Sequence, residues 1–570
     1  MNISDVRQFE HRAFGQMDIS DAEIQAAAAR GMAFSCDQWD YERKFIAAKC
    51  VIEKSIVDFP KSGVRMSMTG GPGGAYGAWF FEANVGSAPA MRLYDLDLAW
   101  DQVLLALKRQ RKDGYFPYVM ADEWGMEHHI GWATLAREIY ELDALRPDRD
   151  RLEWAYERAL KWTRWVQKYR DSNNDGIYES FHEFDIGVDR DPRYLMNETV
   201  WFTHDEKWVP EPAGDSVQDL PMQDLTKSNE QRLEPVKDWS AGQLMRGAYI
   251  SAVTGRLMQA QLMLKAAQER SAGLEPALTR GLQTRAPLSC RLHHLLPYSS
   301  PEVNSMVYCD LVYLAKIADK LGRSAESAKL AGEAEELRER VNAYLWHPED
   351  HCYYDKDRHG NWIKINSDAQ MRALNCGLPT NDMAEVMFTE HILNPDRFWT
   401  PFPLPSVAAD DEAHLPNGDS AWHGPTLCLT PTRAFRAFKN YGYDDDLIEM
   451  ARRIVRHIAA RATFPQQWNP HTGKPGCVDL APAMECSAYV YTHYVAMLCG
   501  VIPRAENQIE WNCFGLPGVN ETEYKQYFNG RTYRLNGQHG RWTGYVDGKM
   551  IPDVADGAIV ITDTQGGHKP

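Results

Sequence analysis

The sequence predicts a mainly α-helical fold in which helical hairpins close into an (α/α) toroid, followed by a small β-rich region. The apolar spacing becomes helical at Asp95 and stays helical up to Pro503. Strand alternation is nearly absent over this span, and the loops between helices are rich in Gly, Pro, Trp and acidic residues. After Pro503 the periodicity fades, and short β-favouring pieces alternate with Asn-Gly, Asp-Gly and Gly-Gly turn signals.

We therefore expect a partly helical lead-in over residues 1–60, a toroidal domain over 61–503 and a small β-rich C-terminal domain over 504–570. In the last of these, strands are expected at 533–535, 542–546 and 558–562. An active site should lie where the loops of the toroid converge. The spacing predicts helices near residues 95–111, 130–144, 148–169, 241–267, 303–321, 324–344, 380–392, 427–440, 444–462 and 483–501.

The composition excludes several classes of partner. The chain has 570 residues, with 62 Lys plus Arg against 79 Asp plus Glu, and a formal charge of −17. Nucleic acids and anionic membranes require a basic face, so neither is expected as a partner. The N-terminus shows no signal peptide, and no apolar run reaches the roughly 18 residues of a membrane span. The 11 cysteines, without a C-x-x-C pair, indicate reduced thiols in a cytoplasmic protein; the oligomeric state is not predicted.

An acidic stretch at residues 181–193 carries the strongest functional signal. Its carboxylates Glu183, Asp185, Asp189 and Asp191 fall within nine residues, beside a glycine and a proline. Negative charges this close together repel one another, so at least one pKa should be raised. A carboxyl group that keeps its proton near neutral pH can act as a general acid. The alternative is a solvated acidic loop without catalytic function.

No metal or cofactor site is expected. The glycine-rich segment 63–90 could be a phosphate-binding loop, but no G-K-[ST] follows it. His128, His129 and His182 have no further ligand at zinc spacing. The segment 171–176 is similar to the start of a calcium loop, but His182 stands where a bidentate glutamate would be needed. A turn is favoured there, with a structural calcium as the alternative.

Several short blocks of residues follow one another in a characteristic order along the chain. They are Asp97-Leu-Ala-Trp, Gln110-Arg-Lys-Asp-Gly-Tyr-Phe-Pro, Ile139-Tyr-Glu, Arg164-Trp, Asp185-Ile-Gly-Val-Asp-Arg-Asp-Pro-Arg, Asn304-Ser-Met-Val-Tyr, Leu345-Trp, Phe398-Trp-Thr-Pro-Phe-Pro-Leu-Pro-Ser, Trp422-His-Gly-Pro-Thr and Trp468-Asn-Pro-His-Thr-Gly. Each block is weak alone, but their common order is specific for a fold. Together they resemble the catalytic domain of glycoside hydrolase family 63, particularly its bacterial mannosylglycerate hydrolase-like members. The resemblance covers roughly residues 75–502 and implies an inverting (α/α)6-barrel enzyme.

The resemblance assigns the general acid to Asp189. In the family this loop runs Trp-Glu-Ser-Gly-Met-Asp-Asn-Ser-Pro-Arg, so Gly187, Pro192 and Arg193 match and the catalytic aspartate falls on Asp189. Asp185, Ile186, Arg190 and Asp191 depart from the pattern. Arg190 matters most, because a cation beside Asp189 would lower its pKa and oppose a protonated resting state.

The second carboxylate of the family is missing. The glutamate that heads its Glu-x-Tyr-Asp-Pro-x-Thr-Gly motif is replaced by Gln466, and an amide cannot take a proton from water. Glu485, an unexpected charge in an apolar helix, is the preferred replacement, with Gln466 orienting the water. A charge on a half-exposed helix face is the alternative for Glu485. The other candidates, Asp410, Asp411 and Asp419, are more simply loop residues.

The expected sugar-binding residues include tryptophans in loops or at helix starts. Indole faces suit stacking on sugar rings, and Trp422 is followed by His423, which adds a polar donor beside the ring. Burial in a helical core is the alternative for each tryptophan. The predicted substrate-binding set is Trp79, Asp185, Arg193, Trp422, His423 and Trp468.

These observations favour a glycoside hydrolase that cleaves a small, α-linked gluco- or mannoside with inversion and needs no cofactor. Asp189 would be its acid, and Glu485 or a loop aspartate its base. Two alternatives stay open. One is a helical toroid that isomerises or eliminates sugars with His182 or another histidine and a tyrosine. The other is a carbohydrate-binding pseudoenzyme, which the loss of the glutamate at Gln466 makes credible.

Overall fold

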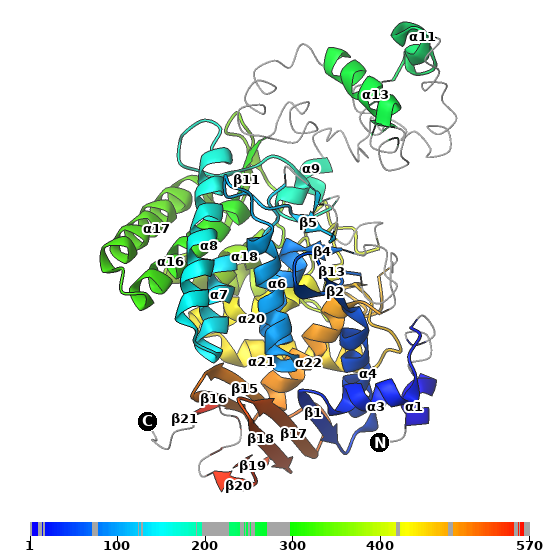
Figure 1. Cartoon of the computed structure of the whole chain (residues 1–570), viewed down its shortest axis with the longest axis vertical. Coiled ribbons are helices and arrows are strands. Elements are labelled where there is room, and N and C mark those ends of the chain that lie inside the picture. Colours follow the sequence, from blue (N-terminus) through cyan, green and yellow to red (C-terminus); the bar gives the residue numbers. More distant parts are fainter. Residues whose placement is uncertain are drawn as a thin grey trace.

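The helices that form the body of the protein, many of which are labelled in Figure 1, pack into an inner and an outer ring. The inner ring consists of α5 (Ala88–Tyr94), α7 (Leu135–Leu145), α16 (Pro301–Lys320), α18 (Ala369–Cys376), α20 (Leu429–Tyr441) and α22 (Glu485–Cys499). Each of these helices packs on the next, and α22 packs on α5, so the ring is closed. The computed structural model describes residues 3–563 except 10–13, 15–16, 71–77, 123–124, 127–128, 190, 196–226, 240–243, 245–246, 249–250, 252–256, 271–296, 418–421, 477–482, 552–553, 555–556 and 558.

An outer helix precedes or follows each inner helix along the chain, which gives the (α/α)6 barrel expected from the sequence. The outer helices are α4 (Trp39–Ser55), α6 (Leu96–Lys108), α8 (Arg149–Tyr169), α17 (Ser324–Leu345), α19 (Asn381–Met387, continued by the π-helix η5, Phe388–Ile392) and α21 (Asp444–Ala459). Further helices are α1 (Ile3–Phe9), α3 (Asp21–Ala29), α9 (Pro192–Leu195), α11 (Asn229–Leu233) and α13 (Leu257–Arg270), with short turns η1 (Phe81–Val85), η2 (Glu183–Asp185) and η4 (Glu234–Val236).

Burial distinguishes the two rings. Every residue of α22 is buried, whereas α21 alternates a buried apolar stripe with exposed charges. The outer helix is also stabilised at its ends, because Asp444, Asp445 and Asp446 lie in its first turn and Arg456 in its last, where they complement the helix dipole. An N-cap defines the start of α8, where the Asp148 side chain accepts a hydrogen bond from the Arg151 amide at 3.0 Å.

Short strands in the loops connect the helices at the N-terminal ends of the inner ring. The paired segments are β4 with β5 and β6, β7 with β8, β11 and β12, and β13 with β14. Their bounds, with those of β2, β3, β9 and β10, are β2 Ile56–Phe59, β3 Val64–Ser67, β4 Trp79–Phe80, β5 Val119–Met120, β6 Gly125–Met126, β7 Glu179–Ser180, β8 Tyr298–Ser299, β9 Trp346–His347, β10 Cys352–Tyr353, β11 Asp355–Lys356, β12 Trp362–Ile363, β13 Thr426–Leu427 and β14 Gln467–Trp468.

The C-terminal region is β-rich, as expected. A five-stranded antiparallel sheet has the order β1-β17-β18-β19-β20, and β15-β16-β21 form a second sheet. Asn529-Gly530 and Asp547-Gly548 have positive φ at both residues, which suits the tight hairpins between consecutive strands. The strands are β1 (Met32–Cys36), β15 (Val501–Ala505), β16 (Gln508–Asn512), β17 (Glu521–Phe528), β18 (Arg531–Gln538), β19 (Arg541–Val546), β20 (Lys549–Ile551) and β21 (Ile559–Asp563).

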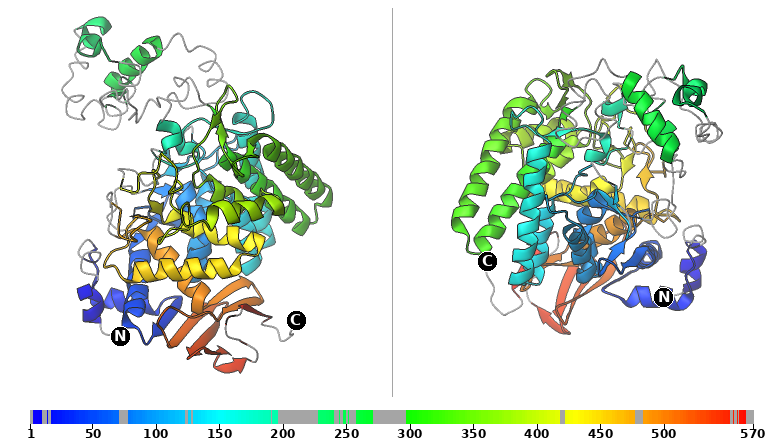
Figure 2. Two further views of the ribbon diagram at one scale, coloured as in Figure 1. Left: turned by 180° about the vertical axis from the view of Figure 1, so that it is seen from behind. Right: turned by 45° about the horizontal axis from the view of Figure 1, so that its top comes forward.

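This sheet and the helix α9 lie at opposite ends of the barrel in both side views (Figures 1 and 2). The expected domain boundaries at residues 60 and 503 stay a prediction. The first 60 residues supply the outer helix α4, and β1 pairs with β17 in the C-terminal sheet. The sequence did not predict α4, α5 or α18. The helix α13 accounts for the last part of the helix expected over 241–267, whose first part lies largely outside the described residues. No helix in the described part of the chain has the length and apolarity to span a membrane.

Candidate active site

The N-terminal ends of the inner helices converge on one polar cluster. Glu82 precedes α5, Trp132 precedes α7, and Glu302 lies in the first turn of α16. Arg372 lies on α18 and Arg433 on α20. Both guanidinium groups lie near the Trp132 ring, 5.2 Å (Arg372) and 5.0 Å (Arg433) from its centroid, and the Trp132 Nε1 donates to the Glu302 carbonyl at 2.9 Å. The convergence of loops expected from the toroid is therefore present.

The acidic loop crosses this end of the barrel and is anchored by Asp185. Its Oδ2 accepts a hydrogen bond from the Phe181 amide at 2.8 Å, and its Oδ1 accepts from the Ile130 amide at 3.0 Å. The buried Arg170 guanidinium lies 3.2 Å from the same Oδ1. Because both oxygens of this fully buried carboxylate bind groups inside the protein, the structure does not support the predicted sugar contact of Asp185 and gives it an anchoring role.

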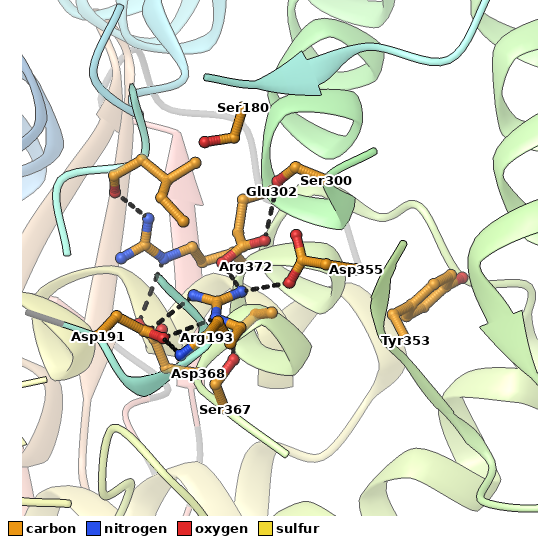
Figure 3. Close-up of polar contacts among 12 residues, drawn as sticks. Ser180, Asp191, Arg193, Ser300, Glu302, Tyr353, Asp355, Ser367, Asp368 and Arg372 are labelled. Atoms are coloured by element: carbon orange, nitrogen blue, oxygen red, sulfur yellow. Dashed lines mark hydrogen bonds and ion pairs between the residues drawn. The ribbon is translucent and has the colours of Figure 1, made fainter. Parts of the chain in front are cut away.

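Arg193 holds the end of the loop through three carboxylates (Figure 3). Its Nε and Nη2 each donate to the Asp191 carboxylate at 2.9 Å, and Nη1 donates to Glu302 at 2.7 Å and to Asp355 at 2.9 Å. The guanidinium is only 1% exposed, so direct sugar binding by Arg193 is not supported either. One arginine does not neutralise three buried carboxylates. Burial, together with the charge of Glu302, raises the pKa of Asp355 to about 7.

Arg372 clamps the middle of the acidic loop. It donates to the Ile186 carbonyl at 2.5 Å, and its Nε lies 3.3 Å from Asp368 Oδ2 (Figure 3). The predicted sugar-binding Trp422 lies over this guanidinium at 5.3 Å and is 4% exposed. Its neighbour His423 is half-buried, and its carbonyl accepts from the Leu415 amide at 2.6 Å. These two residues therefore border the cluster, and their sugar-binding role stays a prediction.

Asp189 is the carboxyl group of the loop that reaches solvent. Its side chain is exposed, yet the surrounding protein partly desolvates it and raises its pKa to about 6. This is the direction that a proton donor requires. Arg190, whose charge was expected to oppose this shift, lies outside the described residues.

Glu82 is a carboxyl group of the site that the sequence did not reveal. It is 6% exposed, and its Oε2 is buried without a hydrogen-bond partner among the residues that the structure describes. Burial raises the pKa of Glu82 to about 8; the cations Arg433 and Arg372 lower it, while the charges of Asp189 and Asp368 raise it. Glu82 lies in the π-helix η1, a helix type that is often found at functional sites. A charged residue among the aromatic residues Trp79, Phe80 and Phe81 was the available signal.

The residues that the sequence offered for the water-activating base differ in burial and in hydrogen-bond partners. Glu485 is the first residue of α22, is buried, and its Oε2 accepts a hydrogen bond from the Gly70 amide at 3.1 Å. Gln466 is half-buried beside β14, and its carbonyl accepts from the Cys428 amide at 3.0 Å. Asp410 is exposed and pairs with Arg397 at 2.9 Å, whereas Asp411 accepts hydrogen bonds from loop amides. Asp419 lies outside the described residues.

Two predicted sugar-binding tryptophans lie in the core. Trp79 and Trp468 are both fully buried. The Trp468 ring stacks on Phe402 with centroids 4.7 Å apart and an interplanar angle of 4°. With no exposed ring face, neither residue is placed to stack on a sugar, and the core alternative fits both. In the described part of the chain, no group of three or more His, Cys, Asp or Glu residues is arranged to hold a metal ion.

The fold is that of the (α/α)6 glycosidases. The chain is similar to a family 63 mannosylglycerate hydrolase from Thermus thermophilus, with 15% identity, a TM-score of 0.55, and coverage of 79% of this chain and 98% of the other. It is also similar to the neutral trehalase Nth1 from Saccharomyces cerevisiae, with 13% identity, a TM-score of 0.52, and coverage of 76% and 73%. A protein described as a sialidase matches 99% of this chain over 45% of its own, at 12% identity and a TM-score of 0.63.

The family itself follows from the sequence match. The family model for the mannosylglycerate hydrolase MGH1-like glycoside hydrolase domain matches residues 85–493, and the chain belongs to this family. The resemblance stated from the sequence blocks is thereby confirmed.

Proposed function

We propose that this protein hydrolyses a small α-linked mannoside or glucoside by a single displacement with inversion. The observation that carries the proposal is the position of Asp189, an accessible carboxyl group with a raised pKa above the inner-helix ends of a glycoside hydrolase domain. Asp189 protonates the leaving oxygen. The assignment of water activation to Glu485, with Gln466 orienting the water, stays a prediction from the sequence.

The structural neighbours suggest which substrates to test first. The Thermus thermophilus hydrolase was solved with glucose and, separately, with Tris and D-glycerate. A substrate panel should therefore contain mannosylglycerate, the corresponding glucoside and simple α-disaccharides. Proton NMR during the first minutes of reaction identifies the anomer that is released. Release of the β-anomer supports an inverting hydrolase, and release of the α-anomer contradicts inversion.

A carbohydrate-binding protein without hydrolytic activity is the second candidate, and the amide at Gln466 is the observation that favours it. The same NMR experiment separates the two functions, because a binding protein broadens the sugar signals without producing a free sugar. A rearranged or unsaturated product would instead indicate the isomerase or lyase alternative. His182 is the histidine named for that alternative. Burial lowers its pKa well below its usual range, and the Phe184 amide donates to its Nδ1 at 3.1 Å.

A further inference from the structure

We propose that Glu82 is the second catalytic carboxyl group, the base that activates water while Asp189 protonates the leaving oxygen. This inference rests on the proposed hydrolytic function. It assigns to a residue of η1, just before the inner helix α5, the role that the resemblance places at Gln466, where this chain has an amide.

The first support is the close approach of Glu82 to the acidic loop. A Cβ atom built on Gly187 would lie 1.4 Å from Glu82 Oε2, so this oxygen lies within about 3 Å of the Gly187 Cα. Asp189 follows two residues later, and Cα atoms two residues apart are at most about 7 Å from each other. The two carboxyl groups are therefore neighbours across the loop. Together the two limits place Glu82 Oε2 within about 10 Å of the Asp189 Cα. The roughly 6.5–9.5 Å between carboxyl groups that an inverting mechanism needs to admit a water molecule is compatible with this upper bound.

The second support is the difference in depth between the two carboxyl groups. Asp189 is exposed, whereas Glu82 lies below the loop and is 6% exposed. A leaving group departs towards solvent, so the donor should lie on the outer side of the scissile bond. The base should lie on the opposite, inner side, because inversion requires water to attack from the face away from the leaving group. The depths of Asp189 and Glu82 match these two positions.

The third support is the charge around the pair. Arg433 and Arg372 lie close enough to favour the ionised form of Glu82, whereas the charges of Asp189 and Asp368 disfavour it. Because burial raises the pKa of Asp189 to about 6 and that of Glu82 to about 8, the pair holds one proton near pH 7. In the free enzyme this proton rests mainly on Glu82.

Substrate binding can move this proton to Asp189. A sugar bound over the exposed Asp189 removes water from its carboxylate, which disfavours the charged form. The two arginines then stabilise the Glu82 carboxylate that remains. This arrangement differs from that of Glu485, whose Oε2 already accepts a hydrogen bond from the Gly70 amide.

The proposed step is balanced in atoms and charge. Water oxygen forms the new bond to the anomeric carbon while the Glu82 carboxylate takes a proton from that water. The bond from the anomeric carbon to the glycosidic oxygen breaks, its electron pair stays on that oxygen, and Asp189 supplies the proton that completes the leaving alcohol. Glu82 ends protonated and Asp189 ionised, which is the resting distribution of the pair.

The test compares Glu82→Gln with Asp189→Asn on two substrates of the same sugar, one with a poor and one with a good leaving group. For Glu82→Gln we expect kcat to fall by roughly 10²–10⁴ on both substrates, because water activation is needed in each case. Asp189→Asn should lose activity mainly on the poor leaving group. Azide should partly restore Glu82→Gln by attacking from the inner face, giving a glycosyl azide of inverted configuration.

Controls separate catalysis from folding. Glutamine resembles the protonated Glu82 in size and charge, so the fold should survive, and circular dichroism with the Tm checks this. Glu82→Asp keeps a carboxyl group and should retain more activity than Glu82→Gln. The matched control is Glu510→Gln, which alters a buried glutamate paired with Arg504 in the C-terminal sheet and should change the Tm without changing kcat.

The outcomes are distinct. Two results would overturn the role of Glu82 as the base. One is a folded Glu82→Gln variant whose activity is within threefold of wild type. The other is a variant that loses activity on the poor leaving group but keeps it on the good one. In either case the proposed hydrolysis would stand. Failure of the wild-type protein to release sugar from any substrate would overturn the proposed function itself, and the role of Glu82 with it.

Discussion

Gly187 lies directly over the carboxyl group of Glu82. No side chain fits between them, because a Cβ at position 187 would be 1.4 Å from Oε2, and the backbone of Gly187 has φ +68°, a conformation that favours glycine. The glycine of the acidic loop is therefore required both for the turn and for the contact with the buried carboxyl group. This contact fixes how closely the loop approaches the inner helices.

Gly187→Ala should consequently impair both stability and activity. The methyl group must displace either the loop or the Glu82 carboxyl group, and we expect a loss of roughly 1–3 kcal/mol in the free energy of unfolding, as for other overpacked sites. Urea unfolding and kcat measure the two effects. The matched control is Gly442→Ala, at a position with φ +77° where no heavy atom of the described residues lies within 4 Å of the new Cβ. A Gly187→Ala variant no less stable than this control would refute the contact.

Asp189→Asn should lower kcat by roughly 10²–10⁴ on a glycoside with a poor leaving group, the usual contribution of general acid catalysis. The amide is nearly isosteric but cannot donate a carboxylic proton. Sugar release at saturating substrate is the measurement, and the Kd for the substrate should change little. Activity within about threefold of wild type on that glycoside would remove Asp189 from the mechanism.

The sequence predicted several long helices because their patterns are repetitive, but it missed the 17-residue α4, most of whose residues are buried. The expected helix 148–169 corresponds to α8, and 324–344 corresponds to α17. The missed α18 has only eight residues and is buried on all sides, so it lacks the amphipathic period that reveals outer helices. The helix α5 was missed for similar reasons, because it has seven residues and begins with a proline in its first turn.

The candidate site was predicted only in part, because depth and pairing are properties of the folded chain. Asp189 stood out in a cluster of carboxylates, but nothing in that cluster shows that Asp185 and Asp191 face inward to arginines. Trp468 was placed in the site because it was expected in a loop, where an indole face could stack on a sugar, although its ring is buried against Phe402. Arg372 and Arg433 could have been noticed as charges in apolar helices, the feature that had singled out Glu485.

The dependence of kcat/KM on pH should be bell-shaped, with limbs near pH 6 and pH 8. Catalysis requires the Asp189–Glu82 pair to hold one proton, and the two pKa values are about 6 and about 8. Below the lower value both groups are protonated and no base remains, while above the higher value no acid remains. A plateau from pH 5 to 9 on a poor leaving group would contradict a titrating pair.

The free energy of unfolding should fall as the pH rises, because the pKa of the Glu82 carboxyl group is raised in the folded state. Because the folded state holds the Glu82 proton more tightly than the unfolded state does, stability contributed by this proton is present below pH 4.5 and is lost as the pH rises through about 8. Wild type should therefore lose more stability than Glu82→Gln between pH 5 and 8. Urea unfolding of both proteins at several pH values measures the difference, and equal slopes would argue against a buried, protonated Glu82.

Arg193→Met should destabilise the protein by about 3–5 kcal/mol, because it leaves buried carboxylates without their cation. The loss should shrink at acidic pH, where these carboxylates take up protons more readily without Arg193. Arg193→Lys is the control, since it keeps the charge but loses the two parallel bonds to Asp191, and it should be intermediate. Denaturant unfolding at pH 5 and pH 7.5 gives both comparisons. A sugar-binding role alone would raise KM without a change in stability.

Glu485→Gln distinguishes the base predicted from the sequence from the one inferred from the structure. If Glu485 activates water, Glu485→Gln loses turnover on every substrate. If Glu82 activates water, Glu82→Gln shows that loss instead. For Glu485→Gln we expect a loss of about tenfold or less, because glutamine still offers an oxygen to the Gly70 amide and the proton acceptor Glu82 remains. Initial rates of both variants on the same glycoside decide between the two residues.

Gln466→Glu completes this comparison by restoring a carboxylate at the position that the family pattern assigns to the base. With a working base already present, the change should be neutral or harmful, since a second carboxylate would compete for the same water and raise the pKa values of its neighbours. The result that would contradict this expectation is a gain of hydrolysis in Gln466→Glu while Glu82→Gln and Glu485→Gln both leave the hydrolysis rate of the wild type unchanged. That pattern would mean that the natural chain has lost its base, and the carbohydrate-binding function would replace hydrolysis.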